Sequence, residues 1–324
     1  MRRTTVNGLV MIALSVMVGG CIPAGAPRTP AAGATFRDCD GCPEMVVMPA
    51  GSFIMGSPED EPARRPTEGP QHRVNIDRPF AVSKYEVTYD EYRRFVESTG
   101  HVSGQNCIVW TGTVGGKPLR GKSWQDPNFP QSGRHPVTCI TWSDAQSYAQ
   151  WLSAKTGARY DLLTEAQWEY AARSGTSTPA SFTGAPGSVC DYANTADQSA
   201  KESGGGPDWK YAGCHDGYGA QTSPVGSYRP NPFGLYDMYG NVWEWTQDCY
   251  HPDYVGAPTD GSAWSAPTCS ARVVRGSSLS APPDNLRSAA RSQGSVEARM
   301  KIGMDAVADF HNWNLGMRVA RVLE

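Results

Sequence analysis

The chain has 324 residues, of which 39% are hydrophobic and 19% charged, and its formal net charge is −3. This nearly neutral balance, without runs of basic residues, argues against nucleic acid as a partner. The 35 glycines, 25 prolines and 10 tryptophans indicate a loop-rich body. We therefore expect a core that depends on aromatic rings, disulfides and bound ions.

The N-terminus has the features of an export signal. Arg2 and Arg3 precede an apolar stretch at 9–18, and 18–21 reads Val-Gly-Gly-Cys. The stretch is too short to span a bilayer, and small residues before a cysteine are typical of a bacterial lipoprotein cleavage site. We expect a signal peptide at 1–20, lipidation of Cys21 and a linker at 21–43. An ordinary signal peptide with an incidental cysteine is the alternative.

The residue after the lipidated cysteine bears on the final location. It is Ile22 rather than Asp, which favours the bacterial outer membrane or cell surface, with the periplasm left open. The Arg2-Arg3 pair also leaves open whether export uses the general or the twin-arginine route.

Removing Cys21 from the nine cysteines leaves eight, an even number in an exported chain, so we expect disulfides. Sequence alone does not fix their connectivity. Local pairs with moderate loops are one pattern consistent with the spacing: Cys107 with Cys139, Cys190 with Cys214, and Cys249 with Cys269. For Cys39 and Cys42 a tight disulfide is favoured over a redox pair or half of a zinc site, because the chain has no second CxxC motif.

The first half of the chain carries strand and helix signals. Residues 45–56 predict a strand, a turn and a second strand, 59–70 a polar loop, and 73–82 another strand. Three capping boxes predict helix starts, at Thr88–Glu91, Ser143–Gln146 and Thr164–Gln167. Each run then meets a glycine suited to a left-handed helix end, at Gly100, Gly157 and Gly175.

The second predicted helix is amphipathic, since one face collects Ala145, Tyr148, Ala149 and Leu152. Beyond Gly175 the sequence has no long periodic segment. We expect loops and short strands there, without a second domain boundary.

Residues 231–245 read Asn-Pro-Phe-Gly-Leu-Tyr-Asp-Met-Tyr-Gly-Asn-Val-Trp-Glu-Trp. Asp237 and Glu244 flank a bend at Gly240-Asn241 that can turn backbone carbonyls inward, so the segment predicts a loop pinned by a hard cation such as calcium. The alternative is that the tryptophans are core and the carboxylates are solvated.

This segment and six ordered blocks resemble the formylglycine-generating enzyme (sulfatase-modifying factor) family. The blocks lie at 49–57, 84–88, 135–142, 163–173, 272–276 and 315–319. The resemblance covers residues 44–324 as one domain. It implies an irregular, loop-rich α+β fold of the C-type-lectin-like kind, with few regular strands and two calcium sites.

The implied calcium sites can be transferred position by position. The first would use Asn194 and Asp216 with the carbonyls of Thr195 and Tyr218; the second would use Asp237 and Glu244 with the carbonyls of Gly240 and Val242. Ligand sets made only of oxygen suit calcium rather than zinc or copper. A Cys190–Cys214 bridge would join the two arms of the first site.

A departure from the family bears on catalysis. Members that generate formylglycine carry two copper-binding cysteines after the Arg-Gly-Gly-Ser block, whereas here no cysteine follows Cys269. Cu(I) needs soft thiolate ligands, so we expect no copper and no catalytic residues for this reaction. The three-histidine iron site of the hercynine-oxygenase branch is not expected either, because its helical domain is missing. A periplasmic member of the pyoverdine-maturation type stays open.

Residues 277–313 lie between framework blocks, where the family builds its substrate-facing surface. Their composition resembles the variable proteins of diversity-generating retroelements, although a drifted, inactive face is an open alternative. The residues predicted to contact a ligand are Leu279, Ser280, Ala281, Asp284, Asn285, Gln293, Ser295, His311 and Trp313.

The resulting hypothesis is an exported, calcium-binding lipoprotein that binds an unknown protein or small molecule through this face. The alternative is an oxidoreductase or maturation factor of the same family that acts on an exported substrate.

Overall fold

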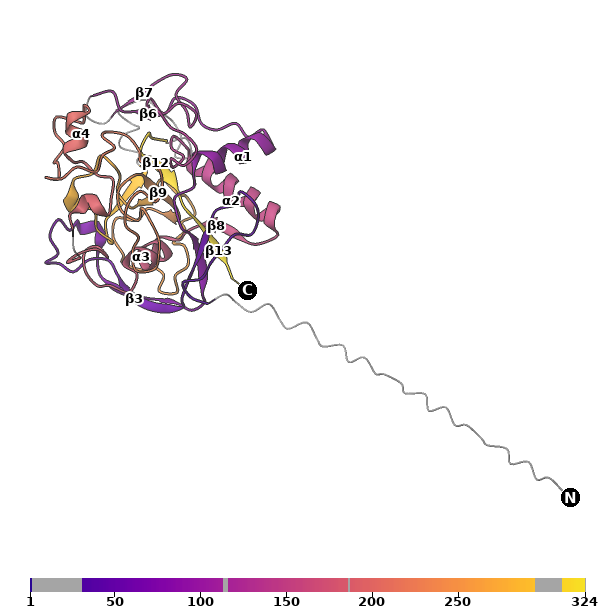
Figure 1. Cartoon of the computed structure of the whole chain (residues 1–324). Coiled ribbons are helices and arrows are strands. Elements are labelled where there is room, and N and C mark those ends of the chain that lie inside the picture. The colour runs from indigo at the N-terminus through magenta and orange to yellow at the C-terminus, as the bar shows by residue number, and fades with distance from the viewer. Residues whose placement is uncertain (2–30, 113–115, 186, 295–310, 324) are drawn as a thin grey trace.

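The computed structural model describes residue 1 and residues 31–112, 116–185, 187–294 and 311–323 (Figure 1). Residues 2–20 of the predicted signal peptide, Cys21 and Ser295 lie outside the described residues, as does the linker up to residue 30. None of the described helices combines the length and apolar character needed to cross a membrane.

The larger sheet has five strands in the order β1-β2-β5-β13-β8, with bounds Thr35–Phe36, Met45–Met48, Phe80–Ser83, Val319–Val322 and Tyr160–Leu162. The C-terminal strand β13 runs antiparallel to both of its neighbours, so Ala320 lies opposite Val82 on one side and Asp161 on the other. The end of the chain therefore ties the N-terminal strands to the middle of the sequence.

The second sheet has four strands in the order β11-β10-β9-β12, with bounds Arg291–Gly294, Arg272–Arg275, Trp243–Cys249 and Leu315–Met317. Strand β12 runs parallel to β9, and the other pairs are antiparallel. Two short ribbons complete the strands: β3 (Gly51–Met55) with β4 (His72–Ile76), and β6 (Ile108–Val109) with β7 (Lys117–Pro118).

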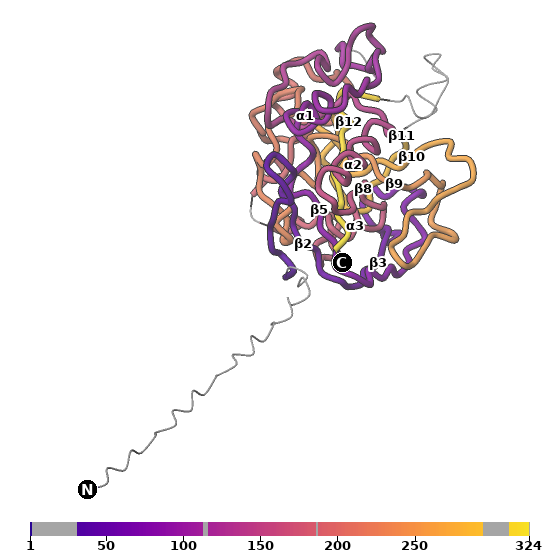
Figure 2. The backbone as a smooth tube through the Cα atoms, turned by 90° about the vertical axis from the view of Figure 1, so that its right-hand side faces the viewer, coloured from indigo at the N-terminus to yellow at the C-terminus, as the bar shows by residue number. Residues whose placement is uncertain are grey.

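The described ranges contain four α-helices around these strands: α1 (Tyr89–Thr99), α2 (Trp142–Thr156), α3 (Glu165–Arg173) and the short α4 (Gln198–Glu202). Single 3₁₀ turns lie at Pro66–Glu68, Val189–Asp191 and Pro283–Asn285. Figure 1 shows β9 and β12 near the centre, α1 and α2 on one flank and α4 on the other. Figure 2 shows the chain turned by 90°, and the residues between the labelled elements form loops, as predicted.

The predicted capping boxes of α1 and α3 are confirmed, because the Thr88 and Thr164 side chains each accept the backbone N–H three residues on. The second box was wrong. Helix α2 is capped by Thr141, which accepts the N–H of Asp144, so Ser143 lies inside the first turn.

The predicted helix ends were right for two of the three helices. Gly100 and Gly157 are left-handed caps, at φ 69° and 71°. Helix α3 instead ends at Ser174 (φ 44°), and Gly175, also at positive φ, follows it. The glycine marks the turn that follows the cap rather than the cap itself.

Two strand predictions also need correction. Residues 73–82 form two strands of different sheets, β4 and β5, because Pro79 lacks an N–H for a continuous ladder. Residues 243–245, predicted as loop, begin β9, since Trp243 and Trp245 pair with β12. The predicted strand, turn and strand at 45–56 are confirmed as β2 and β3.

One core cluster lies between the larger sheet and helices α1 and α2. The face of α2 predicted to be apolar is buried in it, with Tyr148 and Leu152 both fully enclosed. Tyr92 and Phe95 of α1 meet the Tyr148 ring, at centroid distances of 6.1 and 5.8 Å. The aromatic core expected from composition is therefore present, and it fixes both helices to the sheet.

Candidate functional site

The eight cysteines of the described chain form four disulfides: Cys39–Cys42, Cys107–Cys139, Cys190–Cys214 and Cys249–Cys269. All four predicted pairs are thus confirmed. A disulfide sulfur has no thiolate to offer a soft metal, so these cysteines cannot form a Cu(I) site while oxidised. Four disulfides are also consistent with an oxidising compartment outside the cytoplasm.

The first predicted calcium group is brought together by the Asp216 carboxylate. This carboxylate accepts the backbone N–H of Thr195 at 3.1 Å and that of Tyr218 at 2.9 Å. Burial, with the nearby charge of Asp197, raises the pKa of Asp216 to about 6. The Oδ1 atom of Asn194 is buried without a hydrogen-bond partner. A hard cation would give that buried oxygen the electrostatic partner that it lacks.

The second predicted group adjoins the first. Asn241 donates its backbone N–H to the Asn194 carbonyl at 2.8 Å. Gly240 has φ 78°, and a Cβ there would lie 2.1 Å from the same carbonyl, so only glycine allows this approach. The bend that sequence reasoning recognised therefore connects the two candidate sites.

Asp237 supplies the second buried oxygen without a partner. Its Oδ2 accepts the N–H of Gly226 at 2.7 Å, whereas its Oδ1 is buried and has no hydrogen-bond partner. Burial raises the pKa of Asp237 to about 6. A cation beside Asp237 would favour the ionised carboxylate.

Glu244 differs from the other predicted ligands, because the protein already satisfies its carboxylate. Its Oε1 accepts Arg318 Nε at 3.0 Å, and its Oε2 accepts Trp168 Nε1 at 2.7 Å. All three side chains are buried. Glu244 can thus hold the fold through an ion pair, whether or not it also contacts a metal.

Glu86 is a buried carboxylate that sequence reasoning missed. It accepts Asn241 Nδ2 at 2.6 Å and the N–H of Val242 at 3.2 Å, so it holds the bend at Gly240-Asn241 from the other side. Burial raises its pKa well above the usual range, and the charges of Asp237 and Glu244 add to this effect. The only signal was its place in the 84–88 block, which gave the carboxylate no role.

The donor set decides which ion these residues suit. Within the described residues, no three His, Cys, Asp or Glu side chains converge to hold a metal ion. Both candidate sites therefore depend on carbonyls, on the Asp216 carboxylate and on the two oxygens without partners, Asn194 Oδ1 and Asp237 Oδ1. Such hard oxygen donors fit calcium and exclude soft ions.

The structure divides the residues predicted to contact a ligand. Leu279 and Trp313 belong to a buried cluster with the Cys107–Cys139 disulfide. Ala281 and His311 are also buried, and His311 Nε2 lies 2.9 Å from the Gln105 carbonyl. Those that reach the surface are Ser280, Asp284, Asn285 and Gln293, of which Asp284 is the most exposed. A partner contact by the four buried residues would need this core to open.

Buried arginines connect the segment that carries the predicted face to the protein interior. Arg291 Nε lies 2.7 Å from Glu165 Oε1, and Arg287 Nη1 lies 2.6 Å from Glu61 Oε1. Arg275 pairs with Glu169 in the same layer. Hydrogen-bonded charge pairs are strong where water is excluded. The backbone of 275–291 is thus fixed to α3 and to the loop before β4.

Comparison with known proteins places the chain. The sulfatase-modifying factor enzyme 1-like domain matches residues 31–321. The formylglycine-generating enzyme of Streptomyces coelicolor is 33% identical over 270 residues, 72% of this chain and 78% of that protein. The inactive C-alpha-formylglycine-generating enzyme 2 of Mus musculus is 30% identical over 303 residues, 86% of this chain and 85% of that protein.

Solved structures agree with this placement. PvdO from Pseudomonas aeruginosa is 41% identical, with a TM-score of 0.74, and the match covers 91% of this chain and all of that one. Treponema denticola variable protein 1 shares the fold at 20% identity, with a TM-score of 0.59 over 89% of this chain and 98% of its own. The predicted fold class is confirmed, and the chain belongs to the sulfatase-modifying factor (formylglycine-generating enzyme-like) domain family.

Proposed function

We propose that the protein is an exported, calcium-binding lipoprotein that binds a ligand or partner through the exposed part of 277–313. The observation that carries this proposal is the state of the cysteines. All eight in the described chain are oxidised, and none follows Cys269. The fold of a thiolate enzyme is therefore present without its thiolates. The 277–313 face is supported by the buried ion pairs of Arg275, Arg287 and Arg291.

Calcium would have a structural role. Asn194, Asp216 and Asp237 would supply side-chain oxygens, and carbonyls of Thr195 and Tyr218 would complete the first site. The ion would stabilise the loops between the 3₁₀ turn at Val189–Asp191 and β9, because a ligand that binds only the native state raises stability by mass action.

The lipid anchor extends the proposal to location. Cys21 would carry the lipid, and residues 21–43 would link the domain to the bacterial outer membrane or cell surface. The disulfides support an oxidising compartment without selecting between these surfaces and the periplasm.

The binding face can be tested by site-specific photo-crosslinking in cells. A crosslinker at Asp284 or Gln293 should trap one discrete adduct. A crosslinker at Glu97, exposed on α1, is the matched control and should give none. Equal adducts from all three positions, or none from Asp284 and Gln293, would contradict the assigned face.

A maturation factor or oxidoreductase is the second candidate, and a polar cluster favours it. Asn314 Nδ2 donates to Ser278 Oγ at 2.9 Å and to Ser280 Oγ at 3.1 Å. The cluster lies where the family builds its substrate-facing surface. Ser278 and Asn314 are buried and Ser280 is half-buried, so Ser280 is the member that would hydrogen-bond a substrate. The likeness to PvdO over its whole length also makes a shared role with that protein a candidate.

One assay addresses the family reaction. Purified protein with copper and a sulfatase-type cysteine peptide should produce no formylglycine by mass spectrometry, even with reductant, because the thiolate pair is missing. The Streptomyces coelicolor enzyme would serve as the positive control. Appearance of the aldehyde would refute the argument from the missing pair.

The flanking DNA separates the two candidates. A reverse-transcriptase gene with an adenine-rich near-copy of the codons for 277–318 would establish a variable receptor, whereas a neighbouring biosynthetic cluster would favour the maturation enzyme.

A further inference from the structure

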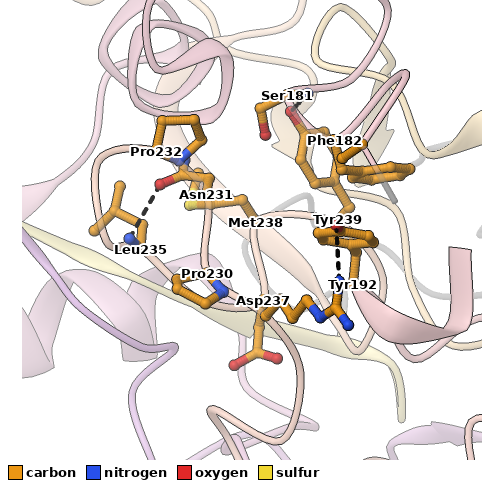
Figure 3. A pocket seen from close by; sticks show the side chains of 12 residues that line it. Ser181, Phe182, Tyr192, Pro230, Asn231, Pro232, Leu235, Asp237, Met238 and Tyr239 are labelled. Atoms are coloured by element: carbon orange, nitrogen blue, oxygen red, sulfur yellow. Dashed lines mark hydrogen bonds between the residues drawn. The ribbon is translucent and has the colours of Figure 1, made fainter. Parts of the chain in front are cut away.

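A pocket separate from the 277–313 face lies beside the bend that precedes β9. Its volume is about 260 Å³. It is lined by Ser181, Phe182, Ala185 and Tyr192 and by side chains of 229–239. Figure 3 shows the Phe182, Tyr192 and Tyr239 rings on one side of the cavity and Pro232, Asn231 and Leu235 on the other. Ligand pockets for drug-sized molecules start near 300 Å³, so this one suits a smaller molecule.

One wall of the pocket is aromatic. The Phe182 and Tyr192 rings are stacked, with centroids 5.0 Å apart and planes at 12°. The Tyr239 ring stands edge-on to Phe182, at 5.2 Å and 90°. This arrangement offers ring surface to a flat ligand, because aromatic rings favour offset stacking and edge contacts.

The opposite wall is apolar and rigid. It consists of Pro230, Pro232, Leu235 and Met238. Asn231 fixes this wall, because its side chain accepts the N–H groups of Phe233 and Leu235 and donates to the Ala171 carbonyl. The pocket is therefore preformed, which lowers the entropy lost on binding.

Tyr239 anchors the aromatic wall in the same way. Its hydroxyl contacts the Ser181 N–H at 2.9 Å, the Ala172 carbonyl at 3.0 Å and Ser288 Oγ at 2.9 Å. The ring cannot turn out of the pocket without breaking these bonds.

The charged side chains at the pocket determine which polar group a ligand would carry. Arg229 and Asp237 are the charged side chains that line it. Figure 3 shows the Asp237 carboxylate pointing away from the aromatic rings. The Arg229 guanidinium is at the surface, 5.5 Å from the centroid of the Tyr192 ring, and its Nη1 donates to the Tyr192 hydroxyl at 3.3 Å. A guanidinium at the edge of an aromatic wall recognises a carboxylate while the ring beside it stacks.

We infer that this pocket binds a small planar aromatic carboxylate, with its ring against Phe182 and Tyr192 and its carboxylate on Arg229. No residue of the 277–313 face lines this pocket, although Ser288 of that face holds the Tyr239 hydroxyl. The pocket shares Asp237 with the second candidate calcium site, whereas the contacts inferred for the ligand are made by the aromatic rings and Arg229.

Binding can be measured by ligand-observed saturation-transfer NMR on the mature chain, with 2-naphthoate as the probe. The neutral analogue 2-naphthalenemethanol has the same ring system without the charge. Naphthoate should bind saturably and roughly two- to fivefold more tightly than the alcohol, the contribution of one exposed ion pair. Excess calcium in every titration keeps the state of Asp237 fixed.

Variants test separately the contact of the carboxylate with Arg229 and the contact of the ligand ring with Phe182. Arg229→Gln should weaken naphthoate to the level of the alcohol, whereas Arg78→Gln, at an exposed arginine before β5, should change nothing. Phe182→Leu keeps apolar volume but removes the ring, and should weaken both ligands by roughly two- to tenfold. Melting curves for each variant confirm folding.

Two results would overturn the inference. One is the absence of saturable naphthoate binding to folded protein. The other is equal affinity for naphthoate and the alcohol, or for wild type and Arg229→Gln, since the charge would then select nothing.

Discussion

Replacing Glu244 by Gln tests whether this carboxylate stabilises the fold through Arg318 rather than through calcium. Both side chains are 1% exposed, and Arg318 also donates to the carbonyls of Ser83 and Tyr236. Gln keeps an acceptor for the Trp168 indole but leaves the buried guanidinium without its counter-ion. Loss of one partner of a buried pair costs about 3–5 kcal/mol. The remaining acceptors of Arg318 reduce this to about 2–3 kcal/mol.

The size of that loss sets the assay. For a domain of about 280 residues, 2–3 kcal/mol corresponds to a melting temperature lower by roughly 3–5 °C. Urea unfolding at pH 7 should give the same loss in excess calcium and in excess chelator. Asp126→Asn is the control, because its carboxylate is 60% exposed in a pair with Lys122 and such pairs contribute about 0–1 kcal/mol.

Two outcomes would refute the reasoning about Glu244. A loss that is present in calcium and absent in chelator would mean that the carboxylate acts through the metal. An unchanged midpoint in both conditions would mean that the ion pair contributes nothing to stability.

Chelation itself should lower the melting temperature, since a site at 100-fold its Kd contributes about 2.7 kcal/mol; Asp216→Asn should reduce this response, and a melting curve that ignores chelator would mean that the acidic loops are simply solvated. The calcium response should grow from pH 5 to pH 7, because the pKa of Asp216 and of Asp237 is raised to about 6 and protonated carboxylates bind calcium poorly. In chelator the pH dependence of stability reverses. A pKa raised from 3.8 means that the folded state binds more protons than the unfolded state, so the free energy of unfolding should fall as pH rises from 3.8 to about 6. A calcium response that is equal at pH 5 and pH 7 would contradict the raised pKa values. A fatty-acid probe should label the wild type and not Cys21→Ser, and persistent label would remove the lipoprotein assignment.

Local chemistry made several features predictable from sequence. A capping box needs residues only three apart, and the Cys190–Cys214 and Cys249–Cys269 bridges close loops with sequence separations of 24 and 20. The α2 box was misplaced for a related reason: Thr141 and Ser143 are both good caps, and the choice between them depends on packing that a local pattern does not contain.

Contacts between distant segments were not predictable in this way. Glu86 and Asn241 are 155 residues apart, and Arg287 and Glu61 are 226 apart. Nothing near Glu86 in the sequence indicates that its carboxylate meets a bend so far along the chain. Trp313 was assigned to a surface for the same reason, since its burial comes from a cluster that includes the distant Cys107–Cys139 disulfide.

The support beneath 277–291 explains how a loop without regular structure can keep a fixed shape. Ser277 Oγ donates to the Asn285 carbonyl at 2.9 Å, and Arg287 holds Glu61 and Glu68 below it. These bonds use residues inside the protein and not the Asp284 side chain, which lies outside. Substitutions at Asp284 should therefore change what the face presents without changing the face itself. Substitutions at Leu279 should cost stability instead, because its side chain is fully enclosed.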